Sequence, residues 1–292
     1  MTSTASRVAT PVRTVERVSD LRAVLDERRR TGARIGLVPT MGFLHEGHLR
    51  LVDEARRRSD FVVMSIFVNP LQFGPNEDFE RYPRDVAGDT AKAESRGVDL
   101  LFVPAVEEMY AGTRTVVVEP IAVADRWEGA VRPGHFRGVL TVVAKLFHLV
   151  APDVAIFGQK DIQQATLIRA MVRDLDFPLE IVVSPTVRES DGLAMSSRNS
   201  YLSPDERRRA LVLSATLRAI AERAKRGERD AVVLERAGKE VLEREPAVQL
   251  DYLALVDPER LEPVAAVSPG TVVMIAARVG RTRLIDNVIL DL

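Results

Sequence analysis

The sequence predicts an α/β protein built from a doubly wound parallel sheet and a smaller α+β region. Short, uncharged apolar runs alternate with amphipathic segments from about residue 35 to residue 184, and this strand–helix alternation is typical of a parallel sheet covered by helices. A polar stretch at 185–203 interrupts the alternation, and two charged helical segments and three strand-like runs follow it. We therefore predict a Rossmann-like domain over residues 1–186 and a smaller C-terminal α+β domain over residues 187–292.

Composition and charge exclude several classes of protein. Hydrophobic residues at 46% and charged residues at 28% describe an ordinary globular chain of 292 residues. Lys and Arg number 41 against 42 for Asp and Glu, so no overall field attracts nucleic acid or an anionic membrane. The absence of cysteine excludes disulfides, thiolate nucleophiles and cysteine-held metals. No apolar run approaches the roughly 20 residues of a membrane span, and the first residues lack an apolar signal core, so we expect a cytoplasmic protein.

Hydrophobic spacing predicts the elements of the first half of the chain. Ser19 is a candidate cap for a helix at 20–30. Residues 1 to about 14 are polar and read as loose, and the segment 71–84, rich in Pro, Gly, Asn and Asp, reads as a long surface loop. The remaining expected elements are strands at 35–38, 61–68, 98–103 and 115–119, a helix that ends near residue 58, and a helix at 86–96.

The second half of the chain continues the alternation of strands and helices to residue 184, and two helices followed by three strands then replace it. Ser203, Pro204 and Glu206 form a strong helix start, with a serine cap, a proline at the first helical position and a glutamate that reaches back to the cap. We expect helices at 138–150, 162–173, 204–226 and 230–245, and strands at 153–158, 179–184, 248–256, 271–276 and 283–290, the last three antiparallel.

The turn after the run at 35–38 is the leading candidate for a functional site. His45, Gly47 and His48 lie where a strand turns into a helix, which is the edge of an open α/β sheet where ligands bind. Backbone N–H groups at the helix start favour an anion, and two imidazoles at i,i+3 face the same way and can donate to phosphate oxygens. The alternatives are two half-exposed histidines at a helix end, or a zinc site, although a metalloprotease helix has its second histidine at i+4.

A second candidate follows the run at 153–158. Lys160 suits the role of a point charge for phosphate, and Asp161 is a helix cap or a metal ligand. The loop Met195-Ser196-Ser197-Arg198-Asn199 carries hydroxyls and a guanidinium that could close over a nucleotide triphosphate, and its alternative is an ordinary polar linker.

Three further polar residues are candidates for substrate contacts. Gln72 and Gln164 are uncharged groups that could hold the hydroxyl and carboxylate groups of a small substrate, or simply be solvated. Asp89 stands near the start of a helix, where stabilisation of the helix dipole is the simpler explanation.

Read together, these stretches resemble known enzymes. The His-x-Gly-His turn, the lysine after a later strand and the Met-Ser-Ser-Arg loop resemble the nucleotidyltransferase superfamily that includes class I aminoacyl-tRNA synthetases. Longer strings are similar to the pantothenate synthetase (pantoate–β-alanine ligase) family, and their order along the chain makes chance a poor explanation. These strings are Pro39–His48, Phe67–Phe73, Tyr82–Arg84, Arg132–Phe136, Gly158–Asp161 and Asp191–Asn199.

The resemblance implies an AMP-forming ligase that makes a C–N amide bond. ATP and (R)-pantoate would give pantoyl adenylate and pyrophosphate, and the amine of β-alanine would displace AMP to give pantothenate, the vitamin B5 precursor of coenzyme A. It further implies Mg²⁺ with ATP, a homodimer, an ATP- and pantoate-binding catalytic domain over residues 1–186, and a lid domain over residues 187–292.

The resemblance also implies roles for the candidate residues. His48 would be the catalytic histidine with His45 as its partner, Lys160 and Arg198 would neutralise the phosphates, and Asp89 would contact magnesium. Gln72 and Gln164 would bind pantoate, with Gln72 also near β-alanine. The implied ATP-binding set is Met41, Gly42, Phe43, Leu44, His45, Glu46, Gly47, His48, Gly158, Gln159, Lys160, Asp161, Val187, Met195, Ser196, Ser197 and Arg198. Many relatives have Glu at the position of Gln159. The glutamine of this chain therefore lacks one negative charge near the phosphates, while Lys160 and Asp161 remain.

Two other functions compete with this interpretation. An adenylyl- or cytidylyltransferase of the same superfamily that acts on a phosphorylated acceptor would present extra Arg or Lys, whereas Gln72 and Gln164 favour a hydroxylated carboxylic acid. A non-catalytic nucleotide-binding protein has no need of both histidines together with Lys160 and Arg198. Adenylate formation requires positioning and charge stabilisation and no protein nucleophile, which agrees with a chain that lacks cysteine.

Overall fold

The computed structural model describes residues 11–75, 77–113 and 115–292, and the predicted looseness of residues 1–10 lies outside this range. The chain divides into two compact units. Unit 1 comprises Met1–Pro120, Arg132–Phe157 and Ile168–Ser184, and unit 2 comprises Ile121–Val131, Gly158–Leu167 and Pro185–Leu292. The single domain boundary expected between residues 186 and 187 stays a prediction.

Unit 1 is built on a six-stranded sheet with the strand order β1-β4-β3-β2-β5-β6. From β2 the chain moves outward through β3 and β4, and it later returns to add β5 and β6 on the other side of β2. The pairs of β2 with β3 and with β5, and of β4 with β1 and β3, are parallel. This arrangement confirms the predicted doubly wound sheet, and the order reverses between β2 and β5, where such sheets bind ligands. The strands are β1 Arg13–Val15, β2 Ile35–Thr40, β3 Phe61–Ile66, β4 Leu100–Phe102, β5 Val154–Gly158 and β6 Glu180–Ser184.

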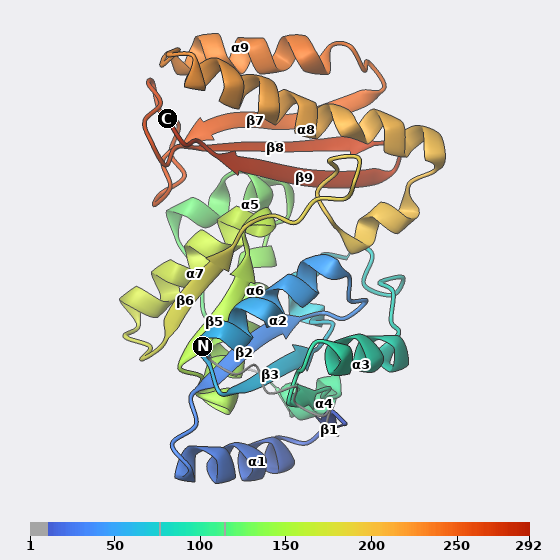
Figure 1. Ribbon diagram of the computed structural model, residues 1–292, viewed down its shortest axis with the longest axis vertical. Helices are drawn as coiled ribbons and strands as arrows, with labels where there is room; N and C mark the ends of the chain where they lie inside the picture. The colour runs from blue at the N-terminus through green and yellow to red at the C-terminus, as the bar shows by residue number, and fades with distance from the viewer. Residues whose placement is uncertain (1–10, 76, 114) are drawn as a thin grey trace, which may run out of the picture. The chain divides into compact units, whose positions relative to one another are not determined.

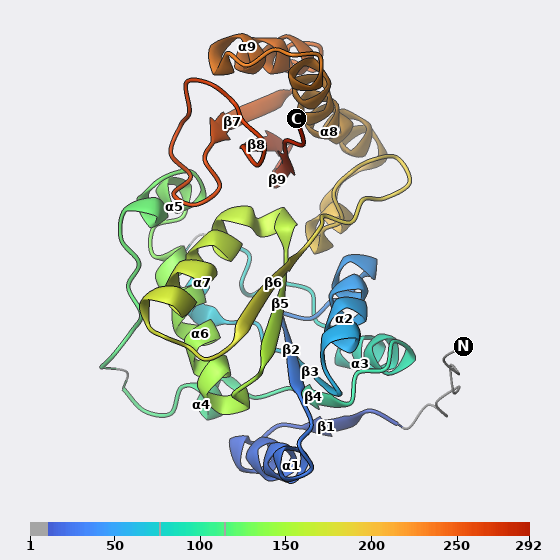
Figure 2. The same ribbon diagram turned by 60° about the vertical axis from the view of Figure 1, so that its left-hand side comes forward.

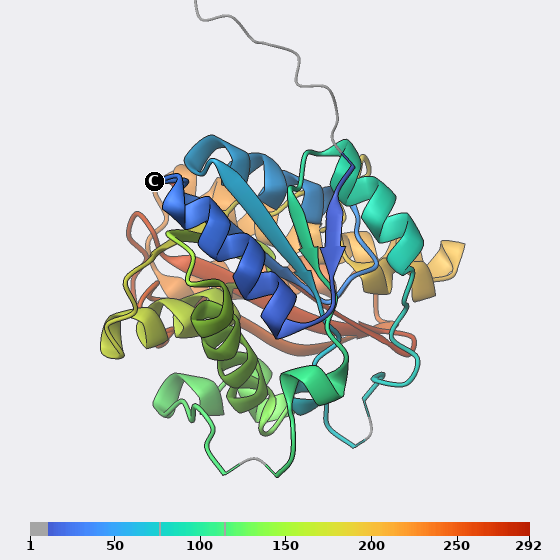
Figure 3. The same ribbon diagram turned by 90° about the horizontal axis from the view of Figure 1, so that it is seen from below.

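Helices cover both faces of this sheet. Helices α1 (Val18–Arg30) and α6 (His135–Val150) contact each other on one face, and α2 (Glu46–Arg58) and α3 (Val86–Ser95) lie on the other (Figures 2 and 3). On the α2 and α3 face the buried side chains of both helices and of the strands form one cluster. Its members include Val38, Leu51, Val52, Ala55, Met64, Ala93 and Ile156. Helix α7 (Ile162–Asp174) begins in unit 2 and ends in unit 1, and α4 (Val106–Met109) is a single turn.

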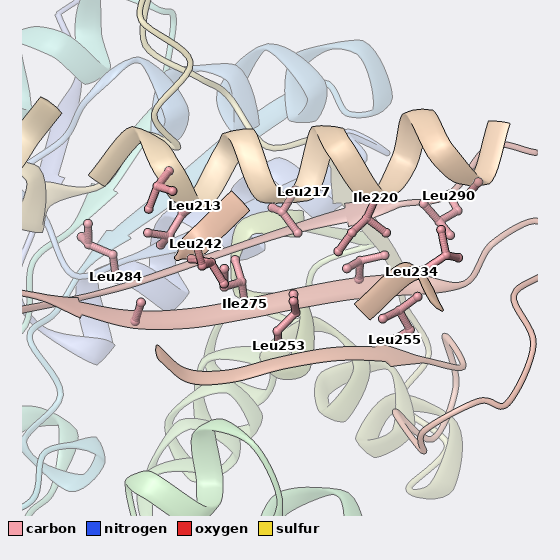
Figure 4. Packing of buried hydrophobic residues seen from close by; sticks show 14 of the residues in the cluster. Leu213, Leu217, Ile220, Leu234, Leu242, Leu253, Leu255, Ile275, Leu284 and Leu290 are labelled. Carbon is pink, nitrogen blue, oxygen red and sulfur yellow. The ribbon is translucent and has the colours of Figure 1, made fainter. Parts of the chain in front are cut away.

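Unit 2 contains a three-stranded antiparallel sheet in the order β7-β8-β9. Its strands are β7 Val248–Val256, β8 Val272–Val279 and β9 Thr282–Ile289. Helices α8 (Pro204–Lys225) and α9 (Ala231–Leu242) cover one face of the sheet, as Figures 1 and 4 show. The predicted capping box at the start of α8 is confirmed, because the Ser203 side chain accepts from the N–H of Glu206 and Glu206 accepts from the N–H of Ser203.

A second apolar cluster lies in unit 2, and it involves the short segments that unit 2 takes from the middle of the chain. Ala254, Val256, Val272 and Met274 of the sheet pack with Ile162 of α7, and Trp127 joins them. The short helices in unit 2 are η2 Ala122–Asp125, α5 Glu128–Val131, η3 Gln159–Asp161 and η4 Ser197–Tyr201. Helix η1, Pro70–Gln72, belongs to unit 1. No helix among the described residues is long and apolar enough to cross a membrane.

Three local predictions were wrong. Ser19 does not cap α1, because the helix begins at Val18 and the N–H of Val18 donates to Glu108 Oε1 at 2.8 Å. Residues 13 and 14, within the segment expected to be loose, belong to β1, which pairs with β4. Residues 115–119 form no strand and are largely exposed. The first two outcomes depend on partners that are distant in sequence, Glu108 and β4, which local spacing does not reveal.

We predict that Ile275→Ala destabilises the protein, because Ile275 is 0% exposed within the α8, α9 and sheet cluster of Figure 4. Removing the side chain leaves a cavity, and the free energy of unfolding should fall by about 2–5 kcal/mol in urea denaturation. Val232→Ala on α9, where the side chain is 73% exposed, is the control and should change it by less than about 0.5 kcal/mol. An Ile275 variant as stable as the parent would contradict this core.

Candidate active site

The turn after β2 depends on two residues with left-handed backbone. Gly42 has φ +83° and Phe43 has φ 52°. Gly42 also lacks room for a side chain, since an added Cβ would lie 2.9 Å from both Asp89 Oδ2 and Ile66 Cγ2. Glycine suits this position on both counts, because it adopts positive φ without strain and allows close approach. The turn therefore passes tightly over the end of β3 before α2 begins.

Asp89 holds this turn in place. Its carboxylate, 1% exposed in the first turn of α3, accepts the N–H of Phe43 through Oδ2 at 2.7 Å and the N–H of Leu44 through Oδ1 at 2.6 Å. A buried carboxylate needs such donors, and hydrogen bonds to a charged acceptor are stronger than neutral ones. This contact with the turn was missed at the sequence level, and contact of Asp89 with magnesium stays a prediction.

The two histidines form the N-terminal cap of α2. His45 is the cap residue and its Nδ1 accepts from the N–H of Gly47 at 3.1 Å, while His48 Nδ1 accepts from the N–H of His45 at 3.3 Å. The ring centroids lie 4.1 Å apart, which confirms that the two imidazoles face the same way. Because each Nδ1 is an acceptor, the proton of each neutral ring is assigned to Nε2. Each ring thus uses Nδ1 to cap the helix and carries its N–H on the opposite side, at Nε2.

This cap changes the predicted basis for anion binding. Two of the backbone N–H groups at the start of α2, those of His45 and Gly47, donate to the imidazoles. Those two backbone N–H groups are therefore already bonded, and anion binding by the free N–H groups expected at this helix start stays a prediction. Glu46, placed in the ATP-binding set, forms ion pairs with Arg50 and Arg96.

Gln72 lies at the end of η1, 8% exposed, and neighbouring groups hold both its backbone and its side chain. Its amide Nε2 approaches Met41 Sδ at 3.2 Å, so Gln72 adjoins the turn that carries the histidines. Asn69 donates to Gln72 Oε1 at 3.0 Å, and His135 Nδ1 lies 2.8 Å from the Gln72 carbonyl oxygen. Gly138 of α6 permits this packing, since a Cβ there would meet the Leu71 carbonyl oxygen at 2.2 Å.

Sequence reasoning did not place Asn69 in the site, although it lies inside one of the strings that carried the resemblance. Asn69 is 1% exposed, donates to the Gly138 carbonyl at 3.1 Å, and accepts from the Tyr110 hydroxyl at 2.8 Å. A buried amide at a strand end needs partners on all sides. The sequence feature that could have identified Asn69 is the Asn-Pro pair directly after the predicted strand at 61–68.

The second group of predicted residues lies in unit 2. Lys160 belongs to η3 directly after β5, its side chain is 20% exposed, and Nζ lies 3.7 Å from Asp161 Oδ2. Asp161 is itself half exposed, at 50%. Gln164 is half-buried in the first turn of α7, next to the buried Gln163, which contacts the segment 123–128.

The loop that contains the remaining predicted residues folds back on itself. The N–H of Met195 donates to the Val187 carbonyl at 2.9 Å, so these two predicted nucleotide contacts are neighbours. The Ser196 side chain caps η4 and accepts from the N–H of Arg198 at 3.3 Å. Ser197 and Arg198 are half-buried within η4. The loop thus contains its own hydrogen bonds and a short helix, and its closure over a nucleotide triphosphate stays a prediction.

The predicted residues thus fall into two groups, one in each compact unit. Residues 41–48, Gln72 and Asp89 belong to unit 1, and residues 158–161, Gln164, Val187 and 195–198 belong to unit 2. Within unit 1, direct contacts join the turn at 41–48 to Asp89 and to Gln72. Among the described residues, no cluster of three or more His, Cys, Asp or Glu side chains could hold a metal ion.

A doubly wound sheet with a histidine turn at its switch point, where such sheets bind ligands, is typical of α/β proteins of the nucleotide-binding class. The model of the family described as pantoate-beta-alanine ligase matches residues 13–289. A pantothenate synthetase of Acidobacterium capsulatum is 57% identical over 290 residues, covering 96% of this chain and 97% of the relative. The chain therefore belongs to the pantoate–β-alanine ligase family, and it is a ligase.

Solved structures agree with this assignment. The crystal structure of pantothenate synthetase from Thermus thermophilus is similar with a TM-score of 0.91 and 52% identity, covering 95% of this chain and 99% of that chain. A pantoate-beta-alanine ligase from Francisella tularensis, complexed with beta-gamma ATP and beta-alanine, has a TM-score of 0.78 and 31% identity, covering 95% of this chain and 97% of that chain.

We predict that Asp89→Asn lowers both stability and turnover. The amide supplies only one oxygen acceptor, so one buried N–H of Phe43 or Leu44 loses its partner, at a cost of about 1–3 kcal/mol in the free energy of unfolding. Urea denaturation and AMP release measure the two effects.

Asp85→Asn is the matched control for that variant. Asp85 caps the same helix, α3, through the N–H of Gly88, and asparagine caps a helix about as well as aspartate does. The control should therefore change stability by less than about 0.5 kcal/mol. Equal effects of the two substitutions would contradict a special role for Asp89 in the turn.

Proposed function

We propose that the chain catalyses the ATP-dependent condensation of (R)-pantoate with β-alanine to pantothenate, through pantoyl adenylate, releasing pyrophosphate and AMP. The observation that carries this proposal is the family match over residues 13–289. The turn geometry adds a physical reason, since two adjacent imidazoles present N–H donors at the switch point of the sheet. The Francisella tularensis relative complexed with beta-gamma ATP and beta-alanine supports the same two substrates.

In the first step a carboxylate oxygen of pantoate attacks the α-phosphorus of ATP. A P–O bond to the new mixed anhydride forms while the bond to pyrophosphate breaks, and negative charge develops on the equatorial oxygens. We propose that His48 Nε2–H donates to this charge, with His45 beside it. Lys160 and Arg198 neutralise the phosphates, because fixed donors and cations stabilise developing charge most effectively where water is excluded.

In the second step the neutral amine of β-alanine attacks the carbonyl carbon of the adenylate. The C–N bond forms, the C–O bond to AMP breaks, and the nitrogen loses a proton. We propose that Gln72 and Gln164 bind pantoate, with Gln72 also near β-alanine. Gln72 is well suited to this, because Asn69 and Met41 contact its amide and fix its orientation. Preorganised hydrogen-bonding groups position reactants without further loss of entropy.

We propose that the remaining predicted residues bind ATP. These are Met41, Gly42, Phe43, Leu44, Glu46 and Gly47 from the turn, and Gly158, Gln159, Asp161, Val187, Met195, Ser196 and Ser197 from unit 2. The turn brings backbone close to a ligand, and the hydroxyls of the 195–198 loop suit phosphate oxygens.

We also propose that Mg²⁺ accompanies ATP. Magnesium in nucleotide sites is usually held by one or two carboxylates together with substrate phosphates. A single carboxylate therefore fits the ion, and Asp89 is our candidate, because each of its oxygens accepts one N–H and keeps a second lone pair. When bound, the ion would offset phosphate charge.

Three broader proposals rest on the resemblance. Residues 1–186 form the ATP- and pantoate-binding catalytic domain, and residues 187–292 form a lid domain that excludes water from the reactive adenylate. The chain acts as a homodimer. It works in the cytoplasm, in keeping with a sequence that contains no cysteine.

AMP release from ATP tests the function directly. We expect release only when both pantoate and β-alanine are present, with pantoate alone supporting pyrophosphate exchange into ATP. A nucleotidyltransferase that uses a phosphorylated acceptor would ignore β-alanine, and a nucleotide-binding protein would bind ATP without turnover. Either outcome would overturn the proposal.

We predict that His48→Ala slows pantoate-dependent pyrophosphate exchange by at least roughly 100-fold, the usual loss when one charge-stabilising donor is removed. His148→Ala, at an exposed position in the last turn of α6, is the matched control and should keep full activity. Near-normal exchange in the His48 variant would remove the assignment of a catalytic histidine.

A further inference from the structure

Strand β9 (dark red in Figure 1) carries two adjacent buried polar residues, Asp286 and Asn287, which are 4% and 2% exposed. Side chains of successive strand residues point to opposite faces of a sheet, so the two serve different neighbours. Leu284, on the same strand, packs in the apolar cluster beneath α8 and α9. Polar groups buried in such a strand must be hydrogen-bonded, and both of these residues bond to segments that contain predicted ATP-binding residues.

Asn287 holds η3. Its Nδ2 donates to the Gln159 carbonyl and to the Lys160 carbonyl, both at 2.9 Å, and its Oδ1 accepts from Gln159 Nε2 at 3.0 Å. An amide NH₂ has two hydrogens, and each has its own carbonyl here. One side chain of β9 therefore engages the turn through three hydrogen bonds.

These bonds act on the backbone on both sides of Lys160. The Gln159 carbonyl belongs to the peptide plane that precedes the Lys160 Cα, and the Lys160 carbonyl belongs to the plane that follows it. Because peptide units are planar, fixing both planes fixes the backbone dihedrals of Lys160 and the direction of its Cα–Cβ bond. The ammonium group then starts from a defined anchor on a long, flexible side chain.

Asp286 holds the neighbouring loop in the same way. Its carboxylate oxygens accept from Arg188 NH1 at 2.7 Å and from Arg188 NH2 at 3.0 Å, and Arg188 also donates to the Gly192 carbonyl. Arg188 pairs with Ala194 in an isolated bridge, which places Val187 beside Met195. Two consecutive residues of β9 thus hold the two segments of unit 2 from which ATP contacts are proposed.

We propose that Asn287 is a positioning residue for Lys160, and that Asp286 and Asn287 together align the 158–161 and 187–198 segments on β9. This inference rests on the proposed function, in which Lys160 contacts the phosphates. Asn287 itself acts through Lys160. Misplacing a catalytic group by about 1 Å can slow a reaction roughly 100-fold, so a small shift of η3 has a large effect on rate.

A double-mutant cycle between Asn287 and Lys160 tests the proposal. Asn287→Ala should slow pantoate-dependent pyrophosphate exchange by about 10- to 100-fold in the parent. In a Lys160→Ala background the same change should slow it by less than about 3-fold, because the group it positions is gone. Independent, multiplicative losses would overturn the proposal. ATP affinity measured by calorimetry on the four proteins gives a second cycle with the same expectation.

Two further variants separate positioning from stability. Asn287→Asp keeps the size of the side chain but removes both N–H donors, so it should lose as much activity as alanine does, and it replaces the alanine variant if that fails to fold. Full exchange activity in Asn287→Asp would overturn the proposal. Leu284→Ala, on the same strand at 5% exposure, should lower the melting temperature while leaving kcat/KM for ATP unchanged.

The parent protein separates this inference from the proposed function. If it shows no pantoate-dependent exchange, the proposed function fails. The ATP-affinity cycle then still decides whether Asn287 acts through Lys160: coupled losses of affinity support the positioning role, and independent losses overturn it. If the parent exchanges pyrophosphate and the losses caused by the Asn287 and Lys160 substitutions are independent, the proposed function stands and only the positioning role of Asn287 fails.

Discussion

The part of the candidate site that lies in unit 1 depends on the contact between Asp89 and the turn after β2. The turn contains Gly42 and Phe43 with positive φ, a conformation that a side-chain-bearing residue such as Phe43 adopts only when the surroundings hold it there. Two hydrogen bonds to one buried carboxylate provide that constraint. They connect α3 to the entry of α2, so the position of His45 and His48 follows from a residue that lies far along the chain, on another helix.

The architecture could be predicted from the sequence because it depends on local periodicity. Apolar runs such as 35–38 and 61–66 and the helical spacing of Leu51, Val52 and Ala55 all identify buried faces without knowledge of their partners. The capping box at Ser203 was equally readable, because its two participants are three residues apart. The elements that escaped prediction, β1 and the uncapped start of α1, are fixed by Leu100–Phe102 and Glu108.

The candidate site shows the same difference between local features, which the sequence reveals, and contacts with distant residues, which it does not. Its residue types and the strand-to-helix positions of His45, His48 and Lys160 were readable, since chemistry and turn position are local properties. The groups that orient them were not. Asp286 and Asn287 have no unusual local context, and the Asn-Pro pair at Asn69 does not reveal its partner. These residues contact Arg188, Lys160 and Gln72 only because folding brings them together. Supporting residues of this kind are visible only in three dimensions.

The imidazole cap of α2 explains why histidines, rather than serine or aspartate, suit this helix start. An aspartate cap satisfies the first N–H groups but offers a bound phosphate no donor and would repel it, whereas a serine cap offers only one short hydroxyl that stays close to the backbone. An imidazole accepts the backbone N–H through Nδ1 and presents Nε2–H on its far side. The hydrogen bond at Nδ1 also holds the ring in one orientation, so the direction of its Nε2–H group is fixed by the cap. The spacing His-x-Gly-His thus caps the helix with the same two rings to which we assign charge stabilisation in the proposed mechanism.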